Sequence, residues 1–429
     1  MTIQLPLAAH DAALAGTMLA MGVAARDAQA KVTKAGPEKR TAALKAIAAR
    51  IRGAKPAILA ANEKDMAAGK AKGLTGAMLD RLELSPARIE AMAKGVEDVA
   101  ALPDPVGTVL ASWTRPNGLE ISRVRGPIGV IGIIYESRPN VTADAAALCL
   151  RAANAVILRG GSESIHSSSA IADAIGQGLA DAGLPVEAIQ LIRTPDRAAV
   201  GLMLTGLNGK LDVLVPRGGK SLVARVQEEA RVPVIGHLEG LCHTYVHEKA
   251  DPAKAEAIIV NGKLRRVGVC GSTETMLIDA SIAPKLLPRL AAALEKAGCK
   301  LRGDQRARAI HPMKAATEED WTTEYLAPIL SIAVVDNLDG AMAHIARYGS
   351  QHTESIVTED DAAAERFLAE VDSAIVMRNA STQFADGAEF GMGAEIGIAT
   401  GRIHARGPVG AEQLTIFKYV VRGDGQIRP

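Results

Sequence analysis

A lone cysteine set among small residues is the first candidate for chemistry in this sequence. Residues 264–274 read LRRVGVCGSTE, so that Arg265 and Arg266 precede Cys270 and a glycine follows it. A cysteine in an apolar neighbourhood is usually inert packing, and it becomes a nucleophile only where its surroundings favour the thiolate. The nearby glycines leave the backbone around the sulfur uncrowded, and the two arginines could lower the thiol pKa or bind a phosphate. Composition alone favours packing, and the rest of the sequence must show whether Cys270 is instead a nucleophile.

Two Gly-Gly pairs stand where short apolar runs end and helical patterns begin. Gly160 and Gly161 follow Arg159, and Gly218 and Gly219 precede a lysine. Glycine lets a phosphate approach the backbone, and a helix N-terminus supplies free N–H groups and a partial positive charge. A tight strand-to-helix turn would need the same glycines, but the flanking cations favour a dinucleotide. The Arg159 guanidinium could bind the additional 2′-phosphate of NADP, or it could be a solvated surface arginine.

Polar residues elsewhere in the chain allow further interpretations. Asn140 ends the first apolar run, where its amide could donate to an oxyanion or cap the helix that follows, and the spacing favours the cap. Residues 236–247 read GHLEGLCHTYVH, but Cys242 and His243 point to opposite faces of a strand and His247 has no usual ligand spacing. We therefore expect no metal site, whereas the histidine and glutamate of GHLEG share a face at a strand end and could form a polar active-site edge.

Two series of alternating strands and helices must position these residues. In the first series, apolar runs at 128–135, 155–158, 188–192, 211–215 and 232–235 alternate with segments of helical length, which predicts a parallel, doubly wound sheet. Ligands bind beyond the carboxyl ends of such strands, where Asn140 and both glycine pairs stand. The second series begins near residue 251. Its expected helices are 251–262, 283–297, 338–348 and 360–371, and its expected strands are 275–278, 329–335 and 354–358.

The two ends of the chain complete this organisation. Residues 1 to about 102 are rich in Ala, Lys, Arg and Glu at helical spacing and predict a helical lead-in. Residues 119–125 predict a strand or hairpin. Residues 413–422 form a β-rich segment with no room for its own sheet, and a strand so placed usually pairs with a distant segment or with another subunit.

Composition limits the classes of partner. The 429 residues carry a formal net charge of +1, and the basic residues are scattered, so neither nucleic acid nor a membrane surface is an expected partner. The N-terminus lacks the basic region of a signal peptide, and no window approaches 18 uninterrupted apolar residues. The four cysteines show no CxxC pairing, which favours a reducing cytoplasm over a zinc or disulfide framework. Small molecules and other subunits remain as partners.

Several stretches together resemble the aldehyde dehydrogenase superfamily, and within it the branch that reduces glutamyl 5-phosphate. The stretches that carry the resemblance are 127–142, 154–161, 215–222, 265–270, 384–387, 403–408 and 421–429. The resemblance implies an α/β fold with a helical lead-in and a Rossmann-type NADP-binding domain in residues 1–248, of which 118–126 form an oligomerisation strand. A second α/β domain, the catalytic domain, is expected in 249–385. A return segment with a small β oligomerisation strand is expected in 386–429.

The same resemblance implies roles for particular residues. Cys270, in a loop between a helix and a strand of the second domain, attacks the acyl carbon as a thiolate, and Asn140 and the Cys270 backbone N–H receive the oxyanion. The thiolate displaces phosphate from L-glutamyl 5-phosphate, and hydride from NADPH reduces the thioester to L-glutamate 5-semialdehyde in proline synthesis. NADP(H) is expected to contact Arg159, Gly160, Gly161, Pro216, Gly218, Gly219 and Glu324. Glu324 would hold the nicotinamide ribose, and the alternative is an exposed acidic residue.

Substrate anions need cations nearby, and the candidates are Arg138, Arg265 and Arg266. Each of these arginines could instead be a structural ion-pair partner. A homo-oligomer built through the terminal strand and a functional link to a glutamate 5-kinase are further expectations from the resemblance.

The sequence departs from the family pattern at two positions. His237 stands where hydrolytic aldehyde dehydrogenases carry a general-base glutamate, so water activation is poorly supported, whereas phosphate is already anionic and does not need that base. Gly271 and Ser272 follow Cys270, where related sequences often have Asn-Ala.

Two competing functions remain open at this point. A hydrolytic NAD(P)-dependent aldehyde dehydrogenase acting on a small semialdehyde would oxidise it without added phosphate. A catalytically silent dinucleotide-binding protein would lose nothing but stability on replacement of Cys270. The presence of Cys270, Asn140 and Glu324 together weighs against the silent protein, because a binding module needs only the glycine turns.

Overall fold

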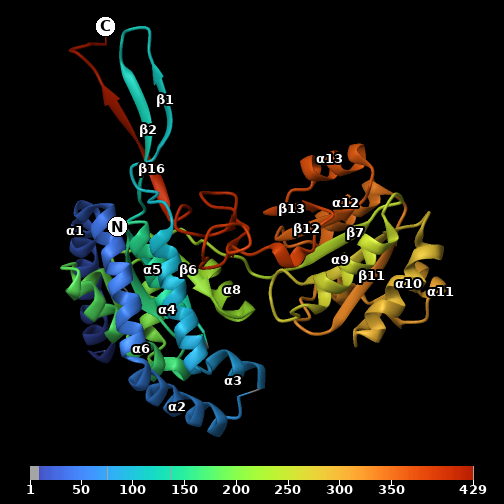
Figure 1. Cartoon of the computed structure of the whole chain (residues 1–429), viewed down its shortest axis with the longest axis horizontal. Helices are drawn as coiled ribbons and strands as arrows, with labels where there is room; N and C mark the ends of the chain where they lie inside the picture. Colours follow the sequence, from blue (N-terminus) through green and yellow to red (C-terminus); the bar gives the residue numbers. More distant parts are fainter. Residues whose placement is uncertain (1–8, 75, 137, 429) are drawn as a thin grey trace. The chain divides into compact units, whose positions relative to one another are not determined.

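The computed structural model describes residues 9–74, 76–136 and 138–428, and these fall into two units (Figure 1). Unit 1 comprises the chain up to Gly236 together with Gly391–Gly397 and Val409–Pro429. Unit 2 comprises His237–Phe390 and Ile398–Pro408. The expected absence of a signal peptide rests partly on residues 1–8, which lie outside the described residues, as does Ser137.

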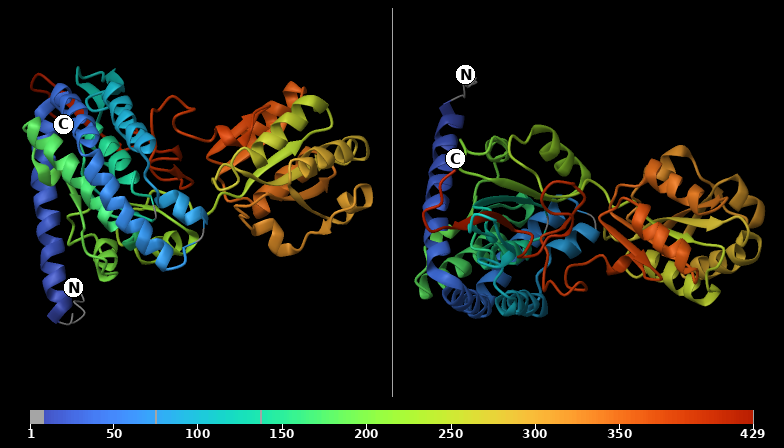
Figure 2. Two further views of the ribbon diagram at one scale, coloured as in Figure 1. Left: turned by 60° about the horizontal axis from the view of Figure 1, so that its bottom comes forward. Right: turned by 90° about the horizontal axis from the view of Figure 1, so that it is seen from above.

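Helices form the N-terminal part of unit 1. They are α1 (Ala9–Gly53), α2 (Lys55–Ala71), α3 (Gly76–Leu82) and α4 (Pro86–Ala101). The long helix α1 runs along one side of unit 1 (Figure 2) and is interrupted at Gly36, which has a φ of 82°. Glycine tolerates this positive φ, and Pro37 can begin the next helical turn because an N–H donor is not needed there. The predicted helical lead-in is confirmed for the described residues.

The sheet of unit 1 is parallel and has the strand order β5-β4-β3-β6. Its strands are β3 (Val130–Tyr135), β4 (Ala155–Arg159), β5 (Ile189–Leu191) and β6 (Val213–Arg217). The connecting helices are α5 (Val141–Arg151), α6 (Ile165–Asp181), α7 (Ala198–Leu204) and α8 (Lys220–Glu229), with short 3₁₀ turns η1 (Ser162–Ser164) and η2 (Val186–Ala188). β3 and β4 are wholly buried, as continuous apolar runs predict. Four of the five predicted strands are thus confirmed.

The fifth predicted strand, residues 232–235, is wrong. Proline at position 233 has no N–H to donate, and the segment makes a single bridge, between Val234 and Leu214. Two backbone hydrogen bonds to Leu214 flank that bridge, so the segment lies beside β6 without continuing as a strand.

Unit 2 contains a larger parallel sheet with the order β10-β9-β11-β8-β7-β12-β13. Its strands are β7 (Cys242–Val246), β8 (Thr273–Asp279), β9 (Lys300–Gly303), β10 (Lys314–Ala315), β11 (Ile329–Val335), β12 (Thr353–Val357) and β13 (Ile375–Arg378). The helices are α9 (Pro252–Leu264), α10 (Ala283–Lys296), α11 (Gln305–Ile310), α12 (Leu338–Tyr348) and α13 (Asp361–Glu370), with 3₁₀ turns η3 (Glu318–Thr322) and η4 (Thr382–Phe384). All three predicted strands and all four predicted helices of this series are confirmed.

The sequence missed β9, β10 and β13, which are four residues long or shorter. β10 and β13 are the two edge strands of this sheet, and β9 lies next to β10. Strands this short carry too few apolar positions to show a period. A small antiparallel pair, β14 (Ile398–Ala399) and β15 (Gly407–Pro408), also belongs to unit 2.

An antiparallel arm projects from unit 1 (Figure 1). It has the order β1-β2-β16 and consists of β1 (Val109–Thr114), β2 (Glu120–Pro127) and β16 (Thr415–Arg422). β16 pairs with β2 over its whole length, from Thr415 opposite Pro127 to Arg422 opposite Glu120. The terminal strand was predicted to pair with a distant segment or with another subunit, and the pairing with a distant segment is confirmed.

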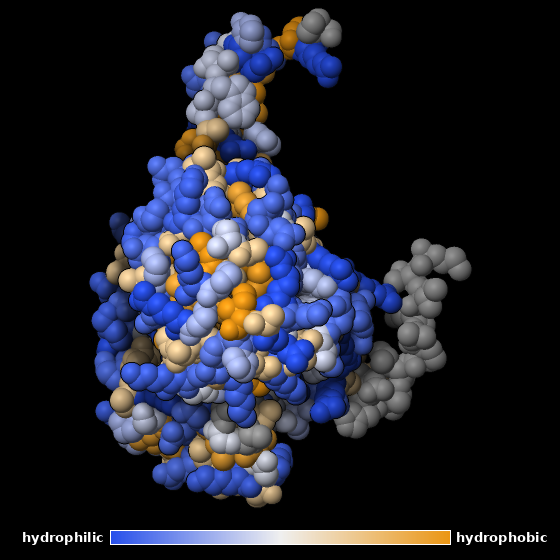
Figure 3. Space-filling view, turned by 90° about the vertical axis from the view of Figure 1, so that its right-hand side faces the viewer, coloured by the Kyte–Doolittle hydropathy of each residue, from blue (hydrophilic) through white to orange (hydrophobic). Residues whose placement is uncertain are grey.

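The described helices do not include one that is both long enough and apolar enough to span a membrane. The face drawn in Figure 3 is covered mostly by hydrophilic residues, with apolar ones in small patches. This mixture agrees with the scattered charges of the sequence.

Candidate active site

Cys270 lies half-buried in the loop between α9 and β8, as expected. Two other backbone segments pass very close to this loop. A Cβ atom on Gly240 would lie 2.1 Å from the carbonyl oxygen of Cys270, and a Cβ atom on Gly271 would lie 2.9 Å from the carbonyl oxygen of Thr382. Both positions therefore need glycine, and the close approach of η4 explains why a glycine follows the cysteine.

A buried ion pair joins the two ends of this loop. Lys263, in the last turn of α9, lies with its Nζ 2.6 Å from Oε2 of Glu274 on β8, and both side chains are almost completely buried. The Ser272 hydroxyl donates to the Lys263 carbonyl oxygen at 3.2 Å. Burial raises the pKa of Glu274, and the ammonium of Lys263 opposes that rise.

A side-chain amide from η4 adds a second constraint on the loop. Nε2 of Gln383 donates to the carbonyl oxygens of Gly262 at 2.9 Å and Arg266 at 3.3 Å. The position of Cys270 is thus determined by groups before, after and beside the loop.

Two histidines lie beside the sulfur of Cys270. One ring nitrogen of His237, one ring nitrogen of His352 and the Cys270 Sγ all lie within 4.8 Å of one another. The two imidazoles meet edge to face, with ring centroids 4.8 Å apart. His352 is completely buried, and His237 is half-buried. The sequence pointed to His237 but carried no signal for His352.

These three residues precede neighbouring strands of one parallel sheet. Cys270 precedes β8, His237 precedes β7, and His352 precedes β12, and these strands are adjacent in the order β8-β7-β12. Because parallel strands begin at the same edge of a sheet, residues far apart in the sequence meet there. In unit 2 the cluster forms at the amino ends of the strands, not at the carboxyl ends that the general rule for open sheets favours.

The histidines change the ionisation of the cysteine. Burial alone would raise the pKa of the Cys270 thiol, but the charges and hydrogen bonds of His352 and His237 hold that pKa well below its usual range. The other three cysteines differ, because burial raises the pKa of Cys149, Cys242 and Cys299. Cys270 therefore combines partial exposure with a stabilised thiolate, which is the signature of a nucleophile.

Glu324 lies in the same cluster. Its Oε1 accepts a hydrogen bond of 3.2 Å from the backbone N–H of Gly240, the glycine that packs on Cys270. The side chain is half-buried rather than exposed, and burial raises the pKa of its carboxyl. The alternative of an exposed acidic residue is therefore wrong.

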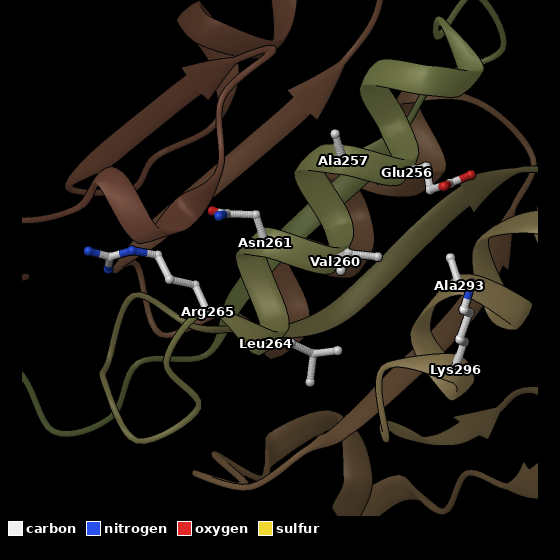
Figure 4. Close-up of a pocket in the computed structure, with 8 residues that line it drawn as sticks. All are labelled: Glu256, Ala257, Val260, Asn261, Leu264, Arg265, Ala293 and Lys296. Atoms are coloured by element: carbon white, nitrogen blue, oxygen red, sulfur yellow. The ribbon is translucent and has the colours of Figure 1, made fainter.

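The predicted substrate arginines are distributed over both units. Arg265 and Arg266 are exposed at the start of the Cys270 loop, and Arg138 is half-buried in unit 1. Arg265 lies at the rim of a hollow of about 550 Å³ between α9 and α10, and its guanidinium points away from Ala293 and Lys296 on α10 (Figure 4). The hollow is lined by Glu256, Ala257, Val260, Asn261, Leu264, Arg265, Ala293 and Lys296, and it does not include Cys270.

Asn140 occupies the N-cap position of α5 in unit 1, but its side chain does not cap the helix. Its Nδ2 instead donates to Oδ2 of Asp144 at 2.9 Å. Burial raises the pKa of Asp144 to about 6, and the bond from Asn140 opposes that rise. The interpretation of Asn140 as a side-chain cap is therefore wrong.

The predicted dinucleotide residues of unit 1 stand at the ends of β4 and β6. Arg159 is only 7% exposed, and its guanidinium donates to the carbonyl oxygens of Gly160 and, at 3.1 Å, Pro195. The solvated-arginine alternative is wrong. Gly161 precedes η1 and α6. A Cβ on Gly160 would lie 3.1 Å from the ring of buried Tyr135.

The second glycine pair holds an anion of the protein itself. The N–H of Gly219, at the N-terminus of α8, donates to Oε2 of Glu136 at 2.8 Å, and a Cβ on Gly218 would lie 2.5 Å from the same oxygen. Pro216 is buried on β6 just before this turn. A carboxylate at this helix N-terminus agrees with the preference of such termini for negative charge.

The metal-capable residues in and just after β7 contact three different partners. Cys242 Sγ lies 3.1 Å from the Cys270 carbonyl oxygen, His243 Nδ1 lies 2.9 Å from Glu354, and His247 Nδ1 lies 2.8 Å from Thr358. Within the described part of the chain, the one trio with metal-ligating groups close together is that of His237, Cys270 and His352.

Comparisons with known proteins give matches over most of the chain. The model of the aldehyde dehydrogenase family matches residues 9–318. A curated protein of Caulobacter vibrioides named gamma-glutamyl phosphate reductase is 67% identical over 413 residues, which cover 96% of this chain and 100% of that protein. The crystal structure of gamma-glutamyl phosphate reductase from Thermotoga maritima superimposes with a TM-score of 0.94 at 43% identity, covering 96% of this chain and 100% of that one.

A more distant solved structure shares the fold. An engineered glycolyl-CoA reductase with bound NADP⁺ is similar with a TM-score of 0.68 at 19% identity, covering 94% of this chain and 96% of that one.

Proposed function

The chain belongs to the aldehyde dehydrogenase family, and from that premise we propose that it reduces L-glutamyl 5-phosphate to L-glutamate 5-semialdehyde in proline biosynthesis. The observation that carries the proposal is the half-buried Cys270, whose thiolate is stabilised by two imidazoles. A thiolate at neutral pH displaces phosphate from an acyl phosphate and forms a thioester. The full-length similarity to curated gamma-glutamyl phosphate reductases supplies the substrate.

Each candidate residue has a proposed role in catalysis or in substrate binding. The Cys270 thiolate forms the bond to the acyl carbon, and the Cys270 backbone N–H together with the Asn140 amide stabilises the negative charge on the carbonyl oxygen. Arg138, Arg265 and Arg266 bind the carboxylate and phosphate of the substrate. Because an acyl phosphate is reactive toward water, a kinase that phosphorylates glutamate is the implied source of substrate.

The family uses NAD(P), and we assign NADPH to this chain. When bound, the cofactor supplies the hydride that reduces the thioester. Its phosphates would bind at the glycine turns, where the Gly219 N–H at the start of α8 already donates to an anionic oxygen, that of Glu136. The proposed contacts are Arg159, Gly160, Gly161, Pro216, Gly218, Gly219 and Glu324.

Hydrolysis of the thioester is not favoured. Hydrolytic relatives carry a general-base glutamate at the position of His237, and this chain has no carboxylate at that position. The curated relatives carry the name of a reductase of gamma-glutamyl phosphate.

Oxidation of glutamate 5-semialdehyde should therefore depend on inorganic phosphate. NADP reduction would be followed at 340 nm with purified chain, with and without phosphate, and we expect a loss of steady-state turnover when phosphate is omitted, because the thioester then has no acceptor. Sulfate at equal ionic strength is the control, and turnover at an equal rate in sulfate would exclude the proposal in favour of hydrolysis.

We also propose that the arm pairs with a second copy of the chain. β16 is an edge strand, and its outer face presents Phe417 and Tyr419, which are 44% and 58% exposed. Tyr419 packs edge to face on Phe417 and on Trp113 of β1, so the three aromatic rings form a continuous apolar surface. An unpaired edge beside exposed aromatic residues is typical of a strand that completes its sheet in another subunit.

Replacing Tyr419 by aspartate should dissociate the oligomer. The charge would be placed at the centre of the aromatic surface, and the molar mass measured by light scattering after gel filtration should fall to that of a single chain. Lys418→Asp, on the opposite face of the same strand, is the matched control and should keep the assembly. An unchanged mass for Tyr419→Asp would contradict the arm as the interface.

A further inference from the structure

The proposed reduction creates a demand for a proton, and the inference that follows rests on that proposed function. When a thiolate displaces phosphate from an acyl phosphate dianion, the phosphate leaves as a trianion, which is a strong base and a poor leaving group. A proton donor beside the reacting atoms would let it leave as hydrogenphosphate. The proton donor must lie within reach of the acyl carbon that is bonding to Cys270.

The two histidines beside the sulfur differ in what they can donate. Nδ1 of His237 lies 2.6 Å from the carbonyl oxygen of Ile398, and because a carbonyl oxygen only accepts, Nδ1 carries a hydrogen. Nε2 is then the nitrogen of His237 that gains and loses a proton. The ring is half-buried, so a substrate group entering the site can meet it.

His352 is enclosed by the protein. Its Nδ1 lies 2.9 Å from the Thr353 hydroxyl and 3.5 Å from Cys242 Sγ. The side chain is completely buried. His352 can therefore act on the sulfur through its charge, but a leaving group outside the loop has no access to its ring.

We propose that His237 is the general acid of the acylation step. Nε2 of His237 takes the proton of the Cys270 thiol. As the sulfur forms its bond to the acyl carbon, the carbon–oxygen bond to phosphate breaks with its electron pair, and the same proton passes from His237 to the departing oxygen. The products are the thioester, hydrogenphosphate and neutral His237. In the reverse direction neutral His237 accepts the proton of hydrogenphosphate as it attacks the thioester.

Other ionisable groups near the cluster do not replace His237. Glu324 interacts electrostatically with Cys270 and both histidines, but it holds the Gly240 N–H through a carboxylate oxygen. Cys242 is buried with a raised pKa and lies against the Cys270 carbonyl oxygen. Neither group combines partial exposure with a nitrogen beside the Cys270 sulfur that can gain and lose a proton.

The test compares two leaving groups in His237→Gln and in the matched variant His352→Gln. Phosphate-dependent NADP reduction by glutamate 5-semialdehyde needs proton transfer to or from phosphate, whereas acylation by 4-nitrophenyl acetate releases a stable anion that needs no proton. The release of 4-nitrophenolate in the first turnover measures acylation directly. Both assays are run at a pH where the rate of iodoacetamide alkylation shows that the thiol of each variant is fully ionised.

We expect His237→Gln to lower the phosphate-dependent rate about 10²–10⁴-fold while the nitrophenolate burst stays within about threefold. At this pH His352→Gln should keep both rates within about threefold, because full ionisation of the thiol removes the effect of that residue on the sulfur. A His237→Gln variant that likewise kept both rates, or lost both by equal factors, would lack a selective effect on phosphate and would overturn the proposal. His237→Asn, tested in parallel, guards against a folding defect of one variant.

Failure of the proposed function has a different signature. In that case the wild-type chain would show no dependence on phosphate, although its nitrophenolate burst would persist.

Discussion

Replacing Cys270 by serine is expected to abolish phosphate-dependent oxidation of glutamate 5-semialdehyde. The serine hydroxyl remains protonated where the thiol of Cys270 ionises, because its intrinsic acidity is far lower than that of a thiol whose pKa the imidazoles of His237 and His352 already depress. Removal of a nucleophile that acts together with its base typically costs on the order of 10⁴–10⁶ in turnover. The measurement is the initial rate of NADP reduction with saturating phosphate.

A matched substitution separates loss of the nucleophile from loss of a cysteine. Cys299 is buried in the core of unit 2, away from the histidine cluster, and Cys299→Ser should retain turnover within about threefold, at a modest cost in stability. Thermal unfolding of Cys270→Ser should match that of the wild type, because the two side chains have similar volumes. Turnover of Cys270→Ser within tenfold of the wild type would remove the thioester from the mechanism.

Replacing Lys263 by methionine is expected to cost about 3 to 5 kcal/mol of the free energy of unfolding, because it leaves the buried carboxylate of Glu274 without its cation. The loss should also depend on pH. Without Lys263 the folded-state pKa of Glu274, which burial already raises, rises further above the unfolded value. The variant should therefore be most stable below the unfolded pKa and lose stability as the pH rises toward the folded pKa. Both effects are measured by urea unfolding, followed by circular dichroism, at pH values from about 5 to about 8.

Two controls locate the cause of this loss in the buried pair. Lys263→Met combined with Glu274→Leu removes both charges and should recover most of the stability. Lys254→Met breaks the exposed pair with Glu359 and should cost less than about 1 kcal/mol. A loss in Lys263→Met that neither grows with pH nor is reversed by the second substitution would contradict an unpaired carboxylate as its origin. Because the pair joins both ends of the Cys270 loop, turnover should recover less completely than stability.

The periodicity of apolar residues was sufficient to predict the regular elements because each buried strand or helix must present a continuous apolar run or face. The runs that became β3, β4 and β11 are buried almost throughout. The prediction failed at residues 232–235, where the apolar pattern is present but a proline removes a donor, and at β13, which is too short to show a pattern. At both places a local feature, a proline in one and a short length in the other, determined the structure, and the apolar pattern did not.

The sequence by itself determined the two α/β series, the glycine turns and the loop in which Cys270 stands between a helix and a strand. It also explained why the backbone around the Cys270 sulfur is uncrowded, because the glycines responsible are close to Cys270 in the sequence. Its general rule for open sheets pointed to the carboxyl ends of the strands, and in unit 2 the histidine cluster forms at the opposite edge.

Only the tertiary structure decided what activates the cysteine. His352 lies 82 residues beyond Cys270, and nothing in its neighbours distinguishes it from the other eight histidines. The two residues meet because β8, β7 and β12 are adjacent parallel strands whose amino ends lie at one edge of the sheet. Strand order is a property of the whole packed sheet, set by helices and strands far from the site, and no local spacing encodes it.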